Sequence, residues 1–304
     1  MIREQAVFPP CYHVRVWGTH QETSHHGNKK TKTRVDDFFF EINLTPLLIK
    51  HGEAAGEMEL LPDNIRGYRG GVIKRLSPSL SNPDIETQHD ELRAWCENYV
   101  SNPSKIKSFA LKREIINHDT KKLEALLRSL IASTNYCGHV GIQFPATHKT
   151  VIVYSPGLVN QWRITQWIRY IFYYTLLFIF SWPVLIFLTA RYEVVKVKYA
   201  YANISPEESG NRIPTVMSEQ AFFNLWETAI RTAVRGKYVN KDQCLDDGYR
   251  LQAEQQERRR MELARNPQLA NTGNAFVDGS IGVLGAGLAL ARAYNSTQGW
   301  GGDC

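Results

Sequence analysis

Four histidines, His13, His20, His25 and His26, lie close together near the start of the chain and are the first residues that could do chemistry. Imidazole is the commonest metal ligand in proteins. A metal site, however, needs a fixed ligand spacing and a carboxylate or carbonyl that orients each ring, and the sequence offers neither here. We therefore interpret the histidines as part of a polar turn, and we predict neither a metal site nor a cofactor.

No other catalytic pattern is complete in the sequence. The segment GSIGVLGAGLALA (279–291) is rich in glycine, but its spacing differs from that of a dinucleotide-binding loop and no βαβ unit surrounds it. The acidic pairs Asp246-Asp247 and Glu207-Glu208 are adjacent in sequence, so their side chains diverge. There is also no nucleophile elbow, zinc-protease motif or phosphate-binding loop. The sequence thus favours a protein that is not an enzyme.

A basic patch follows the histidines and is formed by Lys29, Lys30, Lys32 and Arg34. Cations near a bilayer attract anionic headgroups by about 1 kcal/mol per charge. We expect this patch to contact anionic lipid, the alternative being a solvated surface. The chain carries a net charge of +6, but the patch lacks an aromatic platform and a known nucleic-acid motif, so we expect no nucleic-acid partner.

The cysteines are few and widely spaced, at Cys11, Cys96, Cys137, Cys244 and Cys304. Their odd number and spacing predict neither a disulfide framework nor a zinc site, which suits a reducing compartment. The first residues contain no apolar signal-peptide core. The mean hydropathy of −0.33 argues against a multi-pass channel, and 304 residues are enough for two modest domains.

Alternating aromatic and β-branched residues predict two strands, 12–22 and 31–43, joined by a turn at Gly27 and Asn28. A strand is predicted again over 191–204. Thr87, Asp119 and Ser218 stand where they can cap amphipathic helices. The order of these elements predicts an α+β fold with a mostly antiparallel sheet and a helical C-terminal part.

The apolar run YIFYYTLLFIFSWPVLIFLTA, residues 170–190, dominates the middle of the chain. It holds 21 uncharged residues, enough to cross the ~30 Å hydrocarbon core as one helix. Aromatic and basic residues that could anchor such a helix flank the run or lie within it. These anchor residues are Trp162, Arg163, Trp167, Arg169, Tyr170, Arg191 and Tyr192, and Pro183 within the run would kink the helix. We therefore predict a membrane-embedded helix over 164–191.

Two arrangements of this run are open. In the first, the helix spans the bilayer once and is kinked at Pro183. In the second, the run turns back near Pro183 as a re-entrant hairpin, which lets strand 191–204 join the N-terminal sheet. We favour the single span, because a turn within lipid must satisfy its own backbone groups.

These expectations divide the chain into four parts. They are an N-terminal α+β domain (1–160), the embedded helix (164–191), a strand with two helices (192–267) and a Gly-rich flexible tail (268–304). The first domain is expected in the cytosol, since its translocation would need a signal peptide. The location expected for the whole chain is an endomembrane such as the endoplasmic reticulum.

Three features resemble a family of fungal single-span membrane proteins: the segment TKTRVDDFFFEINLTPLL, the single aromatic-rich apolar run and the terminal GWGGDC. The resemblance implies a membrane location without an assigned activity, and no functional residue carries over from it. We therefore predict a membrane-anchored interaction or scaffold protein whose partners are the lipid bilayer and another protein. The alternative is a membrane-bound enzyme that acts on a lipid or an amphiphile.

Overall fold

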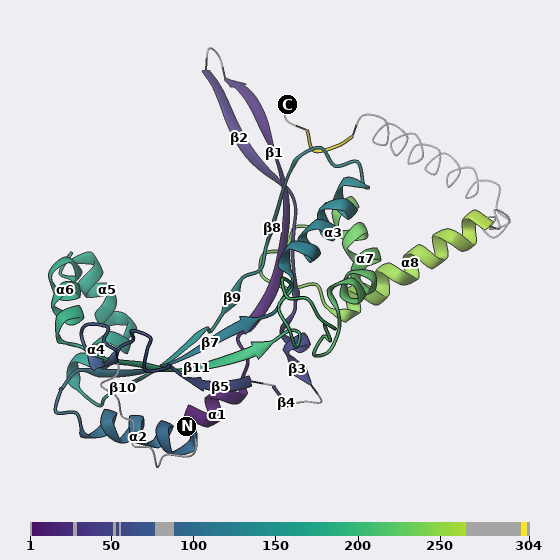
Figure 1. Ribbon diagram of the computed structural model, residues 1–304. Helices are drawn as coiled ribbons and strands as arrows, with labels where there is room; N and C mark the ends of the chain where they lie inside the picture. Colours follow the sequence, from purple (N-terminus) through teal and green to yellow (C-terminus); the bar gives the residue numbers. More distant parts are fainter. Residues whose placement is uncertain are drawn as a thin grey trace. The chain divides into compact units, whose positions relative to one another are not determined.

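The computed structural model describes residues 2–26, 29–50, 53–54, 56–76, 88–265 and 299–302 (Figure 1). The predicted turn at Gly27 and Asn28, the predicted cap Thr87 and most of the Gly-rich tail lie outside these residues. The chain forms two compact units. Unit 1 contains Met1–Pro10, Leu48–Asn117 and Thr147–Asn203, and unit 2 contains Cys11–Leu47, His118–Ala146 and Ile204–Cys304.

The helices of the described residues are α1 (Ile2–Val7), α2 (Gln88–Ser101), α3 (Thr120–Ala132), α4 (Leu158–Ile164), α5 (Gln166–Tyr174), α6 (Phe178–Leu188), α7 (Glu219–Arg235) and α8 (Asp247–Arg265), with a 3₁₀ turn η1 (Thr45–Leu48). The strands are β1 (Cys11–His26), β2 (Lys29–Asn43), β3 (Ile49–Lys50), β4 (Glu53–Ala54), β5 (Gly56–Leu60), β6 (Arg69–Gly71), β7 (Lys107–Ile116), β8 (His139–Gln143), β9 (Ala146–Thr147), β10 (Thr150–Tyr154) and β11 (Ala190–Ala200).

Unit 1 is built on a mixed sheet with the strand order β10-β7-β11-β5, and β6 also pairs with β11. β7 and β11 are parallel, while β10 and β5 run antiparallel to their neighbours. Strand β11 was predicted from its alternating Val and Lys residues, and the structure confirms it. Its place between β7 and β5 depends on partners far away in the sequence.

The two faces of this sheet differ in chemistry. One face is apolar and packs against helices: Tyr199 on β11 donates its hydroxyl to the Ala6 carbonyl of α1 at 2.6 Å, and Tyr99 of α2 stacks edge-on against Phe109. On the other face, ion pairs join neighbouring strands, such as Lys112–Glu193 at 2.6 Å and Lys198–Glu59 at 2.6 Å. The sheet therefore has one core face and one solvent face.

Unit 2 is organised around the long hairpin of β1 and β2, which the sequence predicted and the structure confirms. Inward side chains of both strands form the core, including Val16 opposite Phe40, and β8 pairs with the other edge of β1. Gly18 is required here because an added Cβ would lie 2.2 Å from the ring of Phe38. The predicted α+β class is thus confirmed, with antiparallel and mixed sheets.

Helices α3 and α7 supply the apolar side chains that complete the core of unit 2. The predicted caps are confirmed: the Asp119 side chain accepts a hydrogen bond from the Lys122 N–H, and that of Ser218 from the Ala221 N–H. These two helices bury Leu123, Leu127, Leu130, Ile131, Phe222, Trp226, Ile230 and Val234. Their amphipathic patterns were therefore sufficient to predict the buried stripes.

The prediction of a membrane-crossing helix over 164–191 is wrong. Among the described residues, no helix combines the length and the apolar character that crossing a bilayer requires. The apolar run is divided between α5 and α6, and the chain turns at residues 175–177. The predicted transmembrane, single-pass topology and the endomembrane location inferred from it are corrected accordingly.

The physical reason lies in the sheet of unit 1. β10, which precedes the apolar run, and β11, which follows it, both pair with β7. The chain must therefore return to the sheet that it left. Strand pairing thus requires the apolar run to turn back, as in the re-entrant alternative. The turn, however, lies at Leu176 and not at Pro183.

Candidate functional site

The segment between β10 and β11 leaves and re-enters the sheet at one place. Tyr154, the last residue of β10, lies opposite Ser108, and Ala190, the first residue of β11, lies opposite Lys107. Both ends are therefore fixed at the start of β7, one on each side of it. Helices α4, α5 and α6 form the excursion, as Figure 1 shows. We call α5, α6 and their connection (166–188) the apolar hairpin.

A buried asparagine fixes the base of this excursion. Asn160 of α4 is only 1% exposed, and its Nδ2 donates to the carbonyl and to the Oγ of Ser155, at 3.0 and 2.9 Å. The Ser155 N–H donates to the Lys107 carbonyl at 3.1 Å, which ties α4 to β7. At the other end, the Ala190 N–H donates to the Ile106 carbonyl at 2.9 Å. The excursion is thus anchored to the sheet by hydrogen bonds at both ends.

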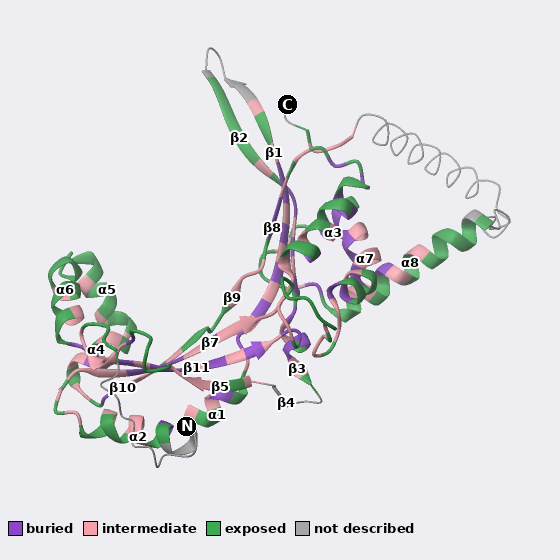
Figure 2. Cartoon of the chain, in the orientation of Figure 1, coloured by how far each residue is buried: buried purple, intermediate pink, exposed green. Residues whose placement is uncertain are grey.

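The apolar hairpin itself buries no residue. Large side chains are exposed along both helices, including Phe180 at 75%, Trp182 at 66% and Phe187 at 72%. In Figure 2 the hairpin is almost entirely coloured as exposed. Exposed apolar surface of this extent is typical of interaction sites, so the hairpin is a candidate for one.

The connection between α5 and α6 satisfies its own backbone groups. The Thr175 N–H and Oγ1 both donate to the Ile171 carbonyl, at 2.9 and 2.6 Å. The Leu176 N–H donates to the Tyr173 carbonyl at 3.3 Å, and its own carbonyl accepts from the Ile179 N–H at 3.1 Å. Leu176 adopts a left-handed φ of 56°, which closes the turn. Internal bonding of this kind is what an apolar environment demands of a turn.

The predicted anchor residues fall into two groups. Trp162, Trp167, Arg169 and Tyr170 lie exposed on α4 and α5, toward the base of the excursion, and Pro183 lies inside α6. Arg163 places its guanidinium 5.1 Å from the centre of the Tyr154 ring, on β10. The other two residues lie on β11, within the sheet. Arg191 lies over the Tyr68 ring. Tyr192 is 3% exposed, and its hydroxyl is hydrogen-bonded to Asn98 and Asn102.

The predicted basic patch lies on β2. Lys30, Lys32 and Arg34 are exposed, and their spacing of two residues puts them on one face of the strand. Lys29 pairs with His26 at the end of the β1–β2 ladder. Because this hairpin belongs to unit 2 and the apolar hairpin to unit 1, we treat the two features as separate candidate lipid contacts.

The four predicted histidines belong to β1. Within the described ranges, no group of His, Cys, Asp or Glu side chains has the arrangement of a metal site. His20 instead contacts Asp37, whose carboxylate oxygens lie 2.9 and 3.0 Å from its Nδ1, and Tyr136 donates its hydroxyl to the same carboxylate at 2.7 Å. The hydrogen bond with Asp37 raises the pKa of His20.

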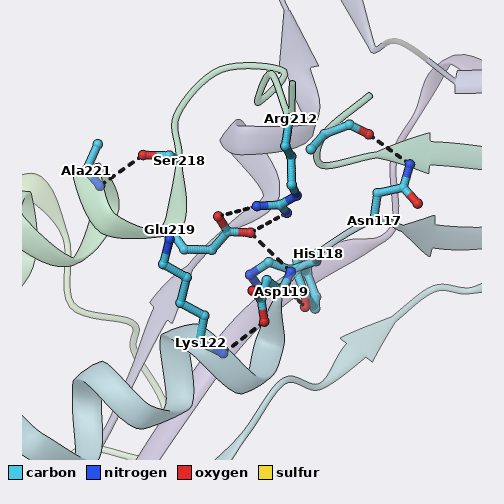
Figure 3. Close-up of polar contacts among 10 residues, drawn as sticks. Asn117, His118, Asp119, Lys122, Arg212, Ser218, Glu219 and Ala221 are labelled. Carbon is cyan, nitrogen blue, oxygen red and sulfur yellow. Dashed lines mark hydrogen bonds and ion pairs between the residues drawn. The ribbon is translucent and has the colours of Figure 1, made fainter. Parts of the chain in front are cut away.

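A buried polar cluster joins the starts of α3 and α7 (Figure 3). Glu219 is 0% exposed, and its two oxygens accept from Arg212 at 2.6 and 2.8 Å. The Asp119 N–H donates to Glu219 Oε1 at 3.1 Å. Although burial raises the pKa of Glu219, the hydrogen bonds from Arg212 and from backbone N–H groups lower it to about 2.

His118 lies next to this cluster. A hydrogen bond of 2.5 Å joins its Nδ1 to the Tyr12 hydroxyl, and its ring stands edge-on to Phe144 at 5.4 Å. Burial lowers the pKa of His118 to about 4, so the imidazole is neutral near pH 7. We interpret the Arg212, Glu219 and His118 cluster as structural, because its bonds close onto helix ends and core residues rather than a hollow. The sequence offered one signal, an acid directly after the cap Ser218.

Two surface hollows lie elsewhere in the described structure. A hollow of about 500 Å³ in unit 2 is lined by Trp17, Arg128, Ile131, Ala132, Tyr136, Gly138, His139, Val140, Gly141, Ile142 and Gln143. A second hollow, of about 410 Å³ in unit 1, is lined by Ile2, Gln5, Phe109, Leu111, Val151, Ile152 and Val153. Neither hollow is lined by Trp162 or Trp167.

Comparison with family models, with curated proteins and with solved structures finds no match to this chain. The resemblance to fungal single-span membrane proteins therefore stays a prediction. The apolar hairpin is the candidate site that the geometry supports best.

Proposed function

We propose that this protein is an interaction or scaffold protein that attaches to a lipid bilayer by inserting the apolar hairpin into one leaflet, without crossing the bilayer. The observation that carries the proposal is the excursion between β10 and β11, which starts and ends beside the first residues of β7 and exposes its apolar side chains. A segment fixed in this way can enter a membrane only by returning to the side from which it came.

The lengths of the two helices support insertion into one leaflet. α5 has 9 residues and α6 has 11, which correspond to about 14 and 17 Å of helix. One leaflet contributes about half of the ~30 Å hydrocarbon core. The hairpin therefore matches one leaflet and is too short for two.

The distribution of side chains favours lipid over a protein partner. A helix that docks on a protein needs one apolar stripe, with polar residues on the opposite face. The hairpin has no charged residue between Arg169 and Arg191, and exposed apolar residues lie on all sides of α6. Trp162, Trp167 and Tyr170 lie toward its base, where amphipathic rings would meet the headgroups.

The test is flotation of the full chain with neutral phosphatidylcholine vesicles, in which electrostatic attraction is minimal. The wild-type chain should float with the vesicles. The Phe180→Asp variant should lose about 100-fold in partitioning, because a carboxylate at bilayer depth costs about 2.5–3.5 kcal/mol on insertion scales.

Val100→Asp provides the matched control. Val100 is 74% exposed, close to the 75% of Phe180, but lies near the end of α2 outside the hairpin. Its substitution should leave flotation unchanged. If the wild-type chain fails to float, or floats equally well with Phe180→Asp, the leaflet proposal is wrong. Discrete oligomers that Phe180→Asp dissociates would instead identify the hairpin as a protein interface.

A further inference from the structure

The strand β10 forms an open edge of the sheet in unit 1. It pairs with β7 on one side, and the register places Ile152 opposite Ala110. The Arg113 N–H donates to the Lys149 carbonyl at 2.7 Å, and the Ser155 N–H donates to the Lys107 carbonyl at 3.1 Å. Since backbone groups alternate in direction along an antiparallel strand, the odd-numbered residues of this stretch bond to β7.

The backbone groups of the even-numbered residues therefore point away from the sheet. They belong to Thr150, Ile152 and Tyr154, and among the described residues none of these N–H and C=O groups has a hydrogen-bond partner. Three N–H donors and three C=O acceptors are thus presented in a row. Such a row is a template for one more strand.

The edge lacks the usual features that prevent pairing. Natural edge strands are blocked by charged side chains, prolines, bulges or a covering element. The sequence of β10, Thr-Val-Ile-Val-Tyr, contains no charge and no proline, and its register with β7 is regular. Ile152 is 44% exposed on the solvent face of the sheet. On the opposite face, Val151 and Val153 are half-buried and line the hollow of about 410 Å³ together with Ile2 and Gln5 of α1.

We propose that β10 pairs with β10 of a second copy of this chain, antiparallel and about a two-fold axis at Ile152. The sheets of the two copies then continue into one another. This inference concerns a different element from the apolar hairpin and does not depend on lipid attachment.

The residues of β10 make a second copy the fitting occupant. In this register Ile152 faces Ile152 of the other copy, Thr150 faces Tyr154, and Val151 faces Val153. Each pair joins β-branched or aromatic side chains, which stabilise sheets, and no like charges meet. A two-fold axis also makes the interface self-complementary. Two short strands bury less than a standard interface, so we expect a weak dimer, with dissociation in roughly the micromolar range.

The experiment is sedimentation of the full chain in a mild non-ionic detergent, which covers the apolar hairpin. The wild type should convert from monomer to dimer as its concentration rises. Ile152→Lys should abolish the dimer, because two lysines then face each other across the axis. Val100→Lys, which adds the same charge at an exposed apolar residue of α2, should leave it unchanged. Circular dichroism checks that both variants remain folded.

Disulfide trapping tests the register. In a background with Cys137→Ser and Cys304→Ser, Ile152→Cys should form a covalent dimer under mild oxidation, because facing Cα atoms lie about 5.5 Å apart. Val151→Cys should not, because its own copy lies on a diagonal roughly 7–8 Å away. The proposal is overturned if the wild type stays monomeric throughout, if Ile152→Lys still dimerises, or if both cysteine variants cross-link equally. A monomer that binds an added strand peptide at this edge overturns the choice of a second copy.

Discussion

Glu219 and Phe180 mark opposite extremes of this molecule: a carboxylate that is 0% exposed in unit 2, and a phenyl ring that is 75% exposed in unit 1. Around Glu219 the chain supplies donors from Arg212 and from the Asp119 backbone, so the buried charge is stabilised within the fold. Around Phe180 the described chain supplies no comparable cover. The buried charge of Glu219 is thus paired within the fold, whereas the apolar hairpin keeps large apolar side chains exposed among the described residues.

The largest effect is expected from breaking the buried pair. Glu219→Ala removes the principal partner of Arg212, whose side chain is only 22% exposed, so we expect the free energy of unfolding to fall by about 3 kcal/mol. Urea denaturation followed by tryptophan fluorescence measures this loss. Glu227→Ala is the matched control, since its pair with Arg231 is more than a third exposed on both sides. That variant should lose less than about 1 kcal/mol, and equal losses would contradict the structural role of the cluster.

The second effect is a pH dependence that originates at His118. Its pKa is about 4 in the folded chain, below the ordinary value of 6.5, because burial disfavours the charged form. The unfolded chain therefore takes up a proton first as the pH falls. Stability is present above pH 6.5 and is lost as the pH falls toward 4, by about 2 kcal/mol between pH 7.5 and pH 5.

The pH test compares unfolding free energies of the wild type and His118→Asn at both pH values. The difference between the two proteins isolates His118. His20 acts in the opposite direction, because its raised pKa adds stability below pH 6.5 that is lost as the pH rises through the folded value. His20→Asn should therefore steepen the loss of stability on acidification. A wild type and a His118→Asn variant with the same pH profile would contradict the assignment.

A smaller effect separates charge from apolar insertion. Lys32 is exposed on β2 and part of the predicted lipid contact. With anionic vesicles, Lys32→Ser should weaken binding by about 1 kcal/mol, roughly fivefold. The loss should disappear at high salt, because screening removes the attraction of the wild-type lysine. The loss caused by Phe180→Asp should persist at high salt. If Lys32→Ser binds anionic vesicles as tightly as the wild type at low salt, the basic patch is a solvated surface without a role in lipid binding.

The smallest effect is expected from the hairpin on the fold itself. Phe187 is 72% exposed, so Phe187→Ser should change the free energy of unfolding in a lipid-free solution by less than about 0.5 kcal/mol. Phe222→Ala, in the core of unit 2, should cost about 3–5 kcal/mol. Similar losses for both would mean that the hairpin side chains stabilise the fold, and the contrast with Glu219 would fail.

Local patterns predicted much of the fold. The caps Asp119 and Ser218 and the stripes that follow them depend on residues within a few positions, and the β1–β2 hairpin depends on an adjacent turn. The division of the apolar run was not predictable in this way. It turns at Leu176, a residue without turn propensity, because β11 must reach β7 about eighty residues earlier in the chain.

The buried cluster shows a similar limit. Arg212 and Glu219 are close in sequence, and an acid at the first position of a helix is a recognisable pattern. The complete burial of Glu219, however, requires α3 to lie against α7, and no local signal in the sequence specifies that contact. The candidate lipid contact was found by composition alone, whereas its geometry required the strand pairing.

Because hydrogen bonds fix both ends of the excursion beside β7, the segment between β10 and β11 could be deleted as one unit. Tyr154 and Ala190 flank the start of β7, so the gap between them is two inter-strand spacings, about 10 Å. A few glycine and serine residues could bridge that distance in place of the helices. Such a shortened chain would keep the sheet but lose the exposed apolar side chains of the hairpin. Conversely, the segment from Ser155 to Thr189 could be inserted between strands of another sheet that share this geometry, as a transplantable unit with both of its ends at one site.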